Sequence, residues 1–291
     1  MQNKILLTGA TGFLGSHLLK RLIEAGADVL ILVRETSNKE RIKNLEGFSI
    51  FTINKQLSNI DALFEMYSID TIIHVATEYG RDLPYSSVLE SNVLLPIKLI
   101  ESADKKKLNL FVNTDSFFSK FQDYSYLKEY IMSKNIFTDY LKSLSGIQVF
   151  NLQLEHIYGE FDSKTKFITS VMGKILVNEK SIKLTEGSQK RDFIYVLDVV
   201  DAYLVVLANK QVLGQYTEFE VGTGSSISVK DFVSKIHQIM DSKSDLLFGA
   251  LVGRINEIKD SKANNLNLCK LGWKPKFTYE TAIKRIVSLE K

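Results

Sequence analysis

The stretch Lys4–Leu19 reads KILLTGATGFLGSHLL and decides the fold of this chain. Its first part, Ile5–Leu7, is a short apolar run that predicts a buried strand. Three glycines, Gly9, Gly12 and Gly15, follow and lead directly into an amphipathic helix. Glycines at this spacing allow a tight turn, a close approach of the backbone to a pyrophosphate, and close packing of the helix on the strand. A ligand-free turn is the alternative interpretation, but the position between strand and helix favours a dinucleotide-binding loop.

Length and composition narrow the class of protein. The 291 residues are enough for one large α/β domain with a smaller lobe, and 37 basic against 34 acidic residues give no general attraction to nucleic acid or to a membrane surface. Cys269 is the single cysteine and cannot form an internal disulfide, and no apolar run reaches the roughly 18 residues of a membrane span. Because the first predicted strand begins at Lys4, we expect no signal peptide. We therefore expect a cytoplasmic protein with no nucleic-acid or membrane partner. No histidine, cysteine or aspartate residues have the spacing typical of a metal site, so we expect no metal.

Strand and helix signals alternate through the first half of the chain. Repeated strand–helix units imply a Rossmann-type, doubly wound parallel sheet, with ligands beyond the carboxyl ends of its strands. We expect a dinucleotide-binding domain over residues 1–155, to which residues 190–215 also belong, and a smaller mixed α/β substrate lobe over 156–291. The expected strands are 4–8, 28–33, 48–53, 71–75, 109–114 and 148–154, and the expected helices are 13–25, 59–67, 85–103, 125–144, 167–177 and 229–240.

Tyr130 and Lys134 stand four residues apart in a predicted helix and therefore lie on one of its faces. A lysine ammonium beside a phenol lowers the pKa of the phenol, so Tyr130 could exchange a proton with a sugar hydroxyl near neutral pH. Tyr124 and Lys128 have the same spacing, so the spacing alone does not choose between the pairs. Thr114, at the carboxyl end of a predicted strand, adds a hydroxyl that can hold a reacting oxygen.

Several short segments, in their order along the chain, resemble those of the extended short-chain dehydrogenases/reductases, which act on nucleotide-sugars. The resemblance covers nearly the whole length. It implies an NAD(P) cofactor, a nucleotide-diphospho-sugar substrate, and Thr114, Tyr130 and Lys134 as catalytic residues. The matching segments are Thr8–Gly15, His74–Ala76 with Asn92, Asn113–Asp115, Tyr130 with Lys134, Arg191–Val196, and Leu271–Pro275.

The resemblance also implies two sets of binding residues. Some of these residues have ordinary structural explanations as well, since Glu78 and Asp115 could each cap a turn and His156 could be a packed histidine. The implied cofactor-binding residues are Gly9, Thr11, Gly12, Phe13, Leu14, Gly15, Arg34, Ala76, Tyr130 and Lys134. The implied substrate-binding residues are Thr77, Glu78, Asp115, Ser116, His156, Arg191 and Arg254.

The end of the second predicted strand bears on the choice of cofactor. Relatives that prefer NAD place an acidic residue where this chain has Val33, and the residue after it is Arg34. A guanidinium suits the 2′-phosphate of NADP(H), so we expect NADPH in preference to NADH. The alternatives are a solvated Arg34 and a ribose contact from Glu35.

Departures from the family pattern indicate the type of reaction. Family dehydratases carry Asp-Glu after the catalytic threonine, whereas this chain has Asp115-Ser116, and the cysteine of the Cys–His epimerase-reductases has no counterpart near the site. The segments Ile73–Gly80, Asn113–Lys120 and Leu154–Gly159 are similar to the subgroup of CDP-abequose and CDP-paratose synthases.

That subgroup reduces the 4-keto group of a CDP-linked 3,6-dideoxyhexose, in the synthesis of O-antigen and other surface polysaccharides. The resemblance therefore implies an NADPH-dependent ketoreductase for a nucleotide-diphosphate-4-keto-deoxyhexose, such as CDP-4-keto-3,6-dideoxyglucose, giving either C4 epimer. The alternatives are an NAD-dependent nucleotide-sugar 4-epimerase and a non-catalytic NADP(H)-binding sensor or scaffold.

The family resemblance further implies a homodimer. In the family, the helices that match residues 85–103 and 125–144 pair across a two-fold axis into a four-helix bundle. Both predicted helices carry more apolar residues than one face of a sheet needs to cover. The residues counted toward this surplus are Val88, Leu95, Leu99, Ile131 and Leu141.

Overall fold

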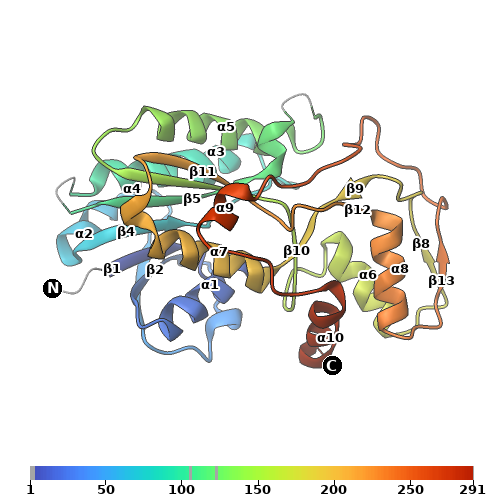
Figure 1. The fold of residues 1–291 in the computed structure, drawn as a ribbon. Coiled ribbons are helices and arrows are strands. Elements are labelled where there is room, and N and C mark those ends of the chain that lie inside the picture. The colour runs from blue at the N-terminus through green and yellow to red at the C-terminus, as the bar shows by residue number, and fades with distance from the viewer. Residues whose placement is uncertain (1–3, 105–106, 122–123, 291) are drawn as a thin grey trace. The chain divides into compact units, whose positions relative to one another are not determined.

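The computed structural model describes residues 4–104, 107–121 and 124–290 and divides into two compact units (Figure 1). The first unit consists of Met1–Gln153 and Val206–Phe219, and the second of Leu154–Val205 and Glu220–Lys291. We expected residues 190–215 to belong to the dinucleotide-binding domain. Residues 190–205 group with the second unit instead. The reason is strand pairing, since β10 (Phe193–Tyr195) lies parallel to β7 (His156–Tyr158) within the second unit.

A seven-stranded sheet with the order β11-β6-β5-β4-β1-β2-β3 forms the centre of the first unit. The paired strands β1/β2, β1/β4, β2/β3 and β4/β5 run parallel. The order reverses between β1 and β4, which is the point where ligands bind in sheets of this kind. The strands are β1 (Lys4–Thr8), β2 (Asp28–Arg34), β3 (Phe48–Ile53), β4 (Ile69–His74), β5 (Leu110–Ser116), β6 (Gln148–Leu154) and β11 (Tyr216–Val221).

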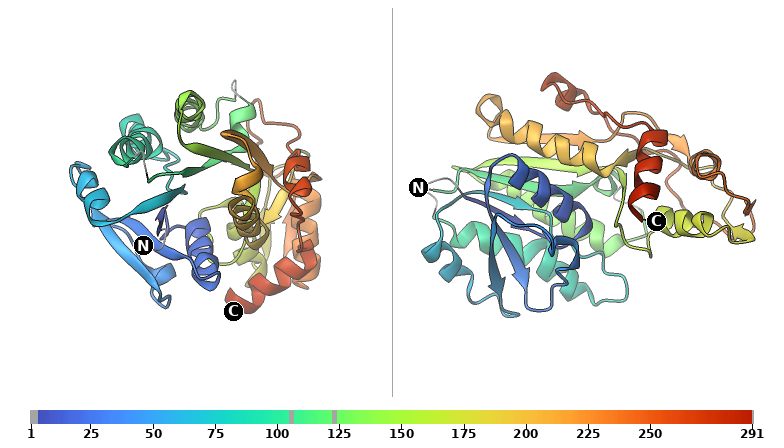
Figure 2. Two further views of the ribbon diagram at one scale, coloured as in Figure 1. Left: turned by 60° about the vertical axis from the view of Figure 1, so that its left-hand side comes forward. Right: turned by 90° about the horizontal axis from the view of Figure 1, so that it is seen from below.

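Helices cover both faces of this sheet, and for that reason its central strands are continuous apolar runs. In Figures 1 and 2, α1 lies on one face and α2, α4 and α5 lie on the other. Leu6, Ile72, Phe111 and Phe137 are fully buried between the sheet and the second group of helices. The helical elements are α1 (Phe13–Glu24), a 3-10 turn (Glu40–Ile42), α2 (Ile60–Met66), α3 (Tyr85–Leu89), α4 (Leu95–Ser102), a second 3-10 turn (Phe117–Lys120) and α5 (Lys128–Ser143).

The helix expected over residues 85–103 is interrupted by a π-helical turn, Glu90–Leu94, between α3 and α4. Turns of this kind are frequent at functional sites. This one carries Ser91 and Asn92, both buried. The turn therefore directs two polar side chains inward from a helix that would otherwise bury apolar groups only.

The second unit is built from helices and short strands, and most of its strands have only two or three residues. The helix α7 (Val196–Ala208) continues the chain from the second unit into the first. Trp273 is buried in the second unit and donates from its indole Nε1 to the backbone oxygen of Asp198 at 3.0 Å. The remaining elements are α6 (Phe167–Leu176), β8 (Ser181–Lys183), β9 (Lys190–Arg191), a 3-10 turn in the first unit (Lys210–Val212), β12 (Ile227–Ser228), α8 (Val229–Ile239), β13 (Asp245–Leu247), α9 (Leu266–Lys270) and α10 (Tyr279–Glu290).

A search of the described parts of the chain for a helix both long and apolar enough to cross a membrane finds none.

Candidate active site

The glycine loop between β1 and α1 leaves no space for side chains at two of its three glycines. Gly9 has a φ of 69°, and a Cβ there would lie 2.5 Å from the backbone nitrogen of Ala76. A Cβ on Gly15 would lie 2.0 Å from the oxygen of Gly9, so only glycine lets α1 approach the loop this closely. Gly12 is exposed, and no side chain caps the N-terminus of α1. The loop therefore fits the pyrophosphate of a dinucleotide.

A buried hydroxyl ties the carboxyl ends of β1 and β4 together beside this loop. The Oγ1 of Thr8 accepts the backbone N–H groups of Val75 and Ala76, both at 3.2 Å, and lies 2.9 Å from Nδ1 of His74. Burial lowers the pKa of His74 to about 3, and the charge of Lys134 adds to the effect. His74 is therefore neutral at physiological pH and has a structural role here.

Arg34 lies exposed at the end of β2 and is held by the π-helical turn. One guanidinium nitrogen donates to the hydroxyl of Ser91. Val33, which occupies the position of the acidic residue in NAD-preferring relatives, is buried. A cation thus stands at the carboxyl edge of the sheet, where the ribose of a dinucleotide is recognised in Rossmann folds.

The structure brings Thr114, Tyr130 and Lys134 together within the first unit. The Nζ of Lys134 donates to the backbone oxygen of Thr114 at 2.8 Å and lies 5.8 Å from the centre of the Tyr130 ring. Tyr130 is 4% exposed and Lys134 is 2% exposed. The competing pair is not equivalent, because α5 begins at Lys128 and leaves Tyr124 outside the helix. Tyr124 instead stacks on Phe118, with ring centres 5.8 Å apart.

The protonation state of Tyr130 differs from the expectation. Burial raises the pKa of its phenol well above 10, and the charges of Tyr79 and Asp115 raise it further. Hydrogen bonds with the side chains of Ser116 and Thr77 lower it again but do not outweigh burial. The prediction that the lysine brings this pKa close to neutral is wrong for the protein alone, because desolvation of a phenolate in the interior is the larger effect. Tyr130 is therefore protonated at neutral pH, which suits a proton donor.

Burial lowers the pKa of Lys134 to about 8, and the nearby carboxylate of Asp115 opposes this shift. A buried ammonium loses hydration, so its neutral form is favoured. Lys134 therefore carries its charge at neutral pH and loses it as the pH rises through about 8.

Asn92 fixes the loop that follows β4 to the helix that carries Tyr130. Its amide donates to the backbone oxygen of Glu78 at 2.8 Å and to the hydroxyl of Ser133 at 2.9 Å, and its Oδ1 accepts the N–H of Glu78 at 2.8 Å. Ser133 in turn donates to the backbone oxygen of Tyr130 at 2.7 Å. Such a fully satisfied buried network specifies one arrangement of its elements. The family motif indicated Asn92, but nothing in the sequence revealed the part played by Ser133.

Two carboxylates from the predicted substrate set cap local turns. Asp115 is buried, and its oxygens accept the N–H of Ser116 at 2.8 Å, the hydroxyl of Ser119 at 2.7 Å and the amide of Asn151 at 3.1 Å. Glu78 accepts two N–H groups of its own loop, those of residues 79 and 80. The capping interpretation therefore describes both residues in this structure, and a contact of either with the sugar stays a prediction.

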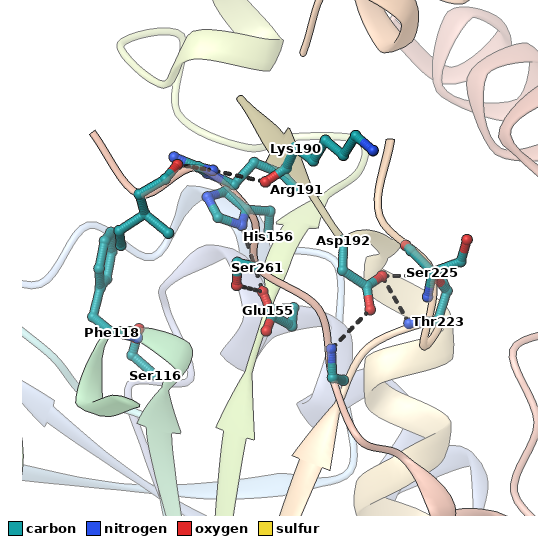
Figure 3. Close-up of polar contacts among 12 residues, drawn as sticks. Ser116, Phe118, Glu155, His156, Lys190, Arg191, Asp192, Thr223, Ser225 and Ser261 are labelled. Atoms are coloured by element: carbon teal, nitrogen blue, oxygen red, sulfur yellow. Dashed lines mark hydrogen bonds and ion pairs between the residues drawn. The ribbon is translucent and has the colours of Figure 1, made fainter. Parts of the chain in front are cut away.

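Both arginines of the predicted substrate set belong to the second unit and share one carboxylate. Arg191 is 5% exposed, donates to the backbone oxygens of Ile258 at 2.6 Å and Lys190 at 2.7 Å, and forms an ion pair with Glu257. The Nη1 of Arg254 lies 3.7 Å from the other oxygen of Glu257, and its side chain is largely exposed. Figure 3 shows the bond from Arg191 to its neighbouring backbone.

His156 is packed within the second unit. Its ring meets the ring of Phe193 edge-on at 5.8 Å. Its Nδ1 lies 3.8 Å from a carboxylate oxygen of Glu155 (Figure 3). Glu155 also accepts the hydroxyl of Ser261 at 2.7 Å. Burial lowers the pKa of His156, against the influence of Glu155, so the ring is neutral near pH 7. The packed interpretation therefore describes His156 better than a catalytic one.

Over residues 4–104, 107–121 and 124–290, no group of three or more histidine, cysteine, aspartate or glutamate side chains is arranged to hold a metal ion.

Comparison with known proteins agrees with this geometry. The profile of the NAD dependent epimerase/dehydratase family matches residues 5–222. The chain belongs to this family. The match covers the glycine loop, the strand that carries Thr114 and the helix that carries Tyr130 and Lys134. The predicted family resemblance is thereby confirmed.

Two curated relatives match this member of the family over their whole length. The CDP-abequose synthase of Salmonella typhimurium is 38% identical over 300 residues, covering 99% of this chain and 98% of its own length. The CDP-abequose synthase of Salmonella muenchen is 39% identical over 298 residues, covering 100% and 99%. The predicted similarity to that subgroup is confirmed as well.

Solved structures show the same fold. The UDP-glucose 4-epimerase of Thermotoga maritima, solved with UDP-glucose, superimposes with a TM-score of 0.82 at 18% identity over 99% of this chain and all of its own. The UDP-glucose 4-epimerase of Thermus thermophilus, solved with NAD, gives a TM-score of 0.80 at 19% identity, with 98% of each chain covered. The predicted Rossmann-type fold is confirmed.

Proposed function

We propose that this protein is an NADPH-dependent reductase of the C4 keto group of a nucleotide-diphosphate-4-keto-deoxyhexose, such as CDP-4-keto-3,6-dideoxyglucose. One observation carries the proposal. Thr114, Tyr130 and Lys134 stand together, with Tyr130 protonated, in a chain that is 38–39% identical to CDP-abequose synthases over its full length. A sensor or scaffold built on the same fold would not require this set to remain intact.

Three residues of the first unit would each have a separate role in the reduction. Bound NADPH would supply the hydride for the sugar C4. Tyr130 would give its proton to the C4 oxygen, and Thr114 would hold that oxygen in place by a hydrogen bond. Lys134 would place a positive charge beside the Tyr130 ring and stabilise negative charge as the proton leaves. The glycine loop would hold the pyrophosphate of the cofactor, and in the second unit Arg191 and Arg254 would bind the pyrophosphate of the substrate.

Other reactions of the family fit this chain less well. A 4,6-dehydratase needs a carboxylate at the position of Ser116, and a hydroxyl of ordinary acidity cannot serve as that base. A 4-epimerase would use the same residues, but the full-length relatives at 38–39% identity are synthases, and the putative epimerase among the relatives is 28% identical.

The direct test is NADPH oxidation by the purified protein with a panel of CDP-, dTDP-, GDP- and UDP-linked 4-keto-deoxysugars, followed by NMR of the product. We expect stoichiometric oxidation with at least one nucleotide and a new C4 hydroxyl of single configuration. Interconversion of 4-hydroxy sugars without net oxidation of NADPH would establish the epimerase instead, and NADPH binding with no turnover of any sugar would support a sensor.

The turnover should depend on the charge of Lys134. Because the pKa of this ammonium is about 8 and that of Tyr130 lies well above 10, kcat/KM should be level from about pH 6 to 7.5 and fall as the pH rises through 8. A pH–rate profile with the active substrate checks this. A profile that stays level to about pH 9.5 would show that the ammonium is not needed.

Arg34 should set the preference for the phosphorylated cofactor. Its guanidinium can form charge-assisted hydrogen bonds to the 2′-phosphate, each worth about 1.5–3 kcal/mol. We expect fluorescence titration to give tighter binding of NADPH than of NADH, and Arg34→Ala to remove most of the difference while NADH affinity stays constant. Equal affinities in the unaltered protein would point to Glu35 as a ribose ligand.

We still predict a homodimer, but the apolar residues that could form its interface differ from those that the sequence indicated. Val88, Leu95, Leu99, Ile131 and Leu141 are all buried in the core of the first unit and leave no surplus. The exposed apolar side chains of the same elements are Leu94, Met132 and Ile136, which are 43–50% exposed.

Met132 and Ile136 lie one turn apart on α5, and this helix packs against the π-helical turn that carries Leu94. Exposed apolar side chains that gather into one patch are typical of protein interfaces. Light scattering at micromolar concentration should give twice the 33.0 kDa chain mass, and Met132→Glu with Ile136→Glu should give the monomer. A monomer mass for the unaltered protein would contradict the predicted homodimer.

A further inference from the structure

The π-helical turn Glu90–Leu94 carries two neighbouring polar side chains that hold different parts of the first unit. Asn92 fixes the loop after β4 to the helix that carries Tyr130. Ser91 is 4% exposed, and its hydroxyl accepts a hydrogen bond from a guanidinium nitrogen of Arg34. The reaction proposed above gives Ser91 no role, so its contact with Arg34 calls for a separate explanation.

The turn that carries Ser91 is a rigid support. The amide of Asn92 donates to the backbone oxygen of Glu78 and to the hydroxyl of Ser133, and its oxygen accepts the N–H of Glu78. An amide with both donor hydrogens and its acceptor engaged has little freedom to move. The turn also packs against α5. The hydroxyl of Ser91 is therefore presented from a fixed point.

The backbone of Arg34 is fixed as well, whereas its side chain is long. The N–H of Arg34 donates to the hydroxyl of Ser37 at 2.9 Å, and its carbonyl oxygen accepts the N–H of Ser37 at 3.0 Å. Within the sheet, Arg34 pairs with Ile53 of β3. An arginine side chain has several rotatable bonds, so without the contact to Ser91 the guanidinium would occupy many positions.

A serine hydroxyl orients a guanidinium without neutralising it. In the parts of the chain that the structure describes, no carboxylate forms an ion pair with Arg34. A carboxylate in the place of the Ser91 hydroxyl would hold the guanidinium too, but it would cancel much of the positive charge. The bond to Ser91 occupies one of the five N–H donors of the guanidinium fork. The others, together with the uncompensated charge, suit the oxygens of a phosphate.

We propose that Ser91 is a positioning residue that prepares Arg34 for the 2′-phosphate of NADPH. This inference rests on the proposed function, in which Arg34 sets the preference for the phosphorylated cofactor. A guanidinium that is already held in place loses less entropy when the phosphate binds. Because NADH has no 2′-phosphate, its binding gains nothing from an oriented Arg34. Ser91 thus raises the affinity for NADPH and leaves the affinity for NADH unchanged.

The test is fluorescence titration of both cofactors, which requires no sugar substrate. Ser91→Ala should weaken NADPH binding by about two- to tenfold, the usual cost of ordering one long side chain, and should not change NADH binding. Ser91→Asp should weaken NADPH binding by at least about tenfold, because the new carboxylate would pair with Arg34 and repel the phosphate. In a protein that already carries Arg34→Ala, Ser91→Ala should have no effect on the affinity for either cofactor.

Ser86→Ala is the matched control, because Ser86 is an exposed serine of α3 that lies outside the turn. Its affinities for both cofactors should equal those of the unaltered protein. Thermal unfolding verifies that each variant is folded, and Ser91→Ala alone decides if the buried carboxylate of Ser91→Asp prevents folding.

Two outcomes would overturn the role of Ser91 while leaving the proposed function in place. One is an unchanged affinity of Ser91→Ala for NADPH, and the other is an equal loss of affinity for NADPH and NADH, which a purely structural role would cause. Equal affinities of the unaltered protein for the two cofactors would instead refute the preference for NADPH in the proposed function, and the inference with it.

Discussion

Replacing Tyr130 by Phe should lower kcat for the ketone reduction by about 10²–10⁴-fold, the usual contribution of a positioned proton donor. The substitution removes one oxygen from a ring that is 4% exposed, stacks on Tyr79 and meets Phe118 edge-on, so the ring packing survives. NADPH affinity and the thermal unfolding temperature should therefore stay close to those of the unaltered protein. Steady-state kinetics with the active substrate of the panel measures the loss.

Tyr124→Phe is the matched control for this substitution. Tyr124 has the same spacing to a lysine, is 5% exposed, and lies outside α5, so its phenol is not the expected donor. Its variant should keep nearly full activity. If Tyr124→Phe abolished turnover while Tyr130→Phe preserved it, the acid would have been assigned to the wrong tyrosine.

Replacing Gly15 by Ala should both destabilise the protein and remove NADPH binding. The new Cβ would lie 2.0 Å from the oxygen and 2.7 Å from the carbonyl carbon of Gly9, and neither backbone atom can move away as a side chain would. Overpacking of this kind costs about 1–3 kcal/mol or more. Because the strain pushes α1 away from the loop that would hold the pyrophosphate, NADPH affinity should fall at least about tenfold. Thermal denaturation and fluorescence titration measure the two effects.

Gly173→Ala is the matched control, and we expect it to stabilise the protein. Gly173 lies inside α6, and a Cβ there meets no heavy atom within 4 Å. Removing a glycine from a helix interior stabilises by about 0.5–1 kcal/mol. A Gly15→Ala variant that unfolded at the same temperature as the unaltered protein and bound NADPH equally well would show that close contact at this loop is not required.

The sequence predicted the first unit well because its signals are local. Three strands, Lys4–Thr8, Phe48–Ile53 and Gln148–Leu154, begin and end where the apolar runs do, and the glycine loop marked the place of the sheet reversal. The helix over residues 125–144 begins three residues later than expected, at Lys128, because Leu127 adopts a left-handed φ of 58°. That late start is what separates Tyr130 from its competitor.

The features that the sequence did not reveal depend on tertiary contacts. Strands of two or three residues, such as Lys190–Arg191 and Ile227–Ser228, are too short to show periodicity in the sequence. They form because they pair with each other and, at Lys190, with Asp260. The pKa of Tyr130 depends on how deeply it is buried, which spacing along a helix does not give. The apolar residues that we expected to form a dimer surface are buried in the core instead. Periodicity along these helices did not distinguish the residues of the core from those of the surface.

The central claim is that the hydrogen delivered to the sugar C4 comes from NADPH while the chain's own tyrosine supplies only the proton on oxygen. The most direct measurement is a reaction with NADPH that carries two deuterium atoms at nicotinamide C4, followed by NMR and mass spectrometry of the nucleotide-sugar product. We predict one deuterium bound to the sugar C4 and none at C3 or C5. A product formed with no deuterium at C4, or with label at a neighbouring carbon, would contradict the claim.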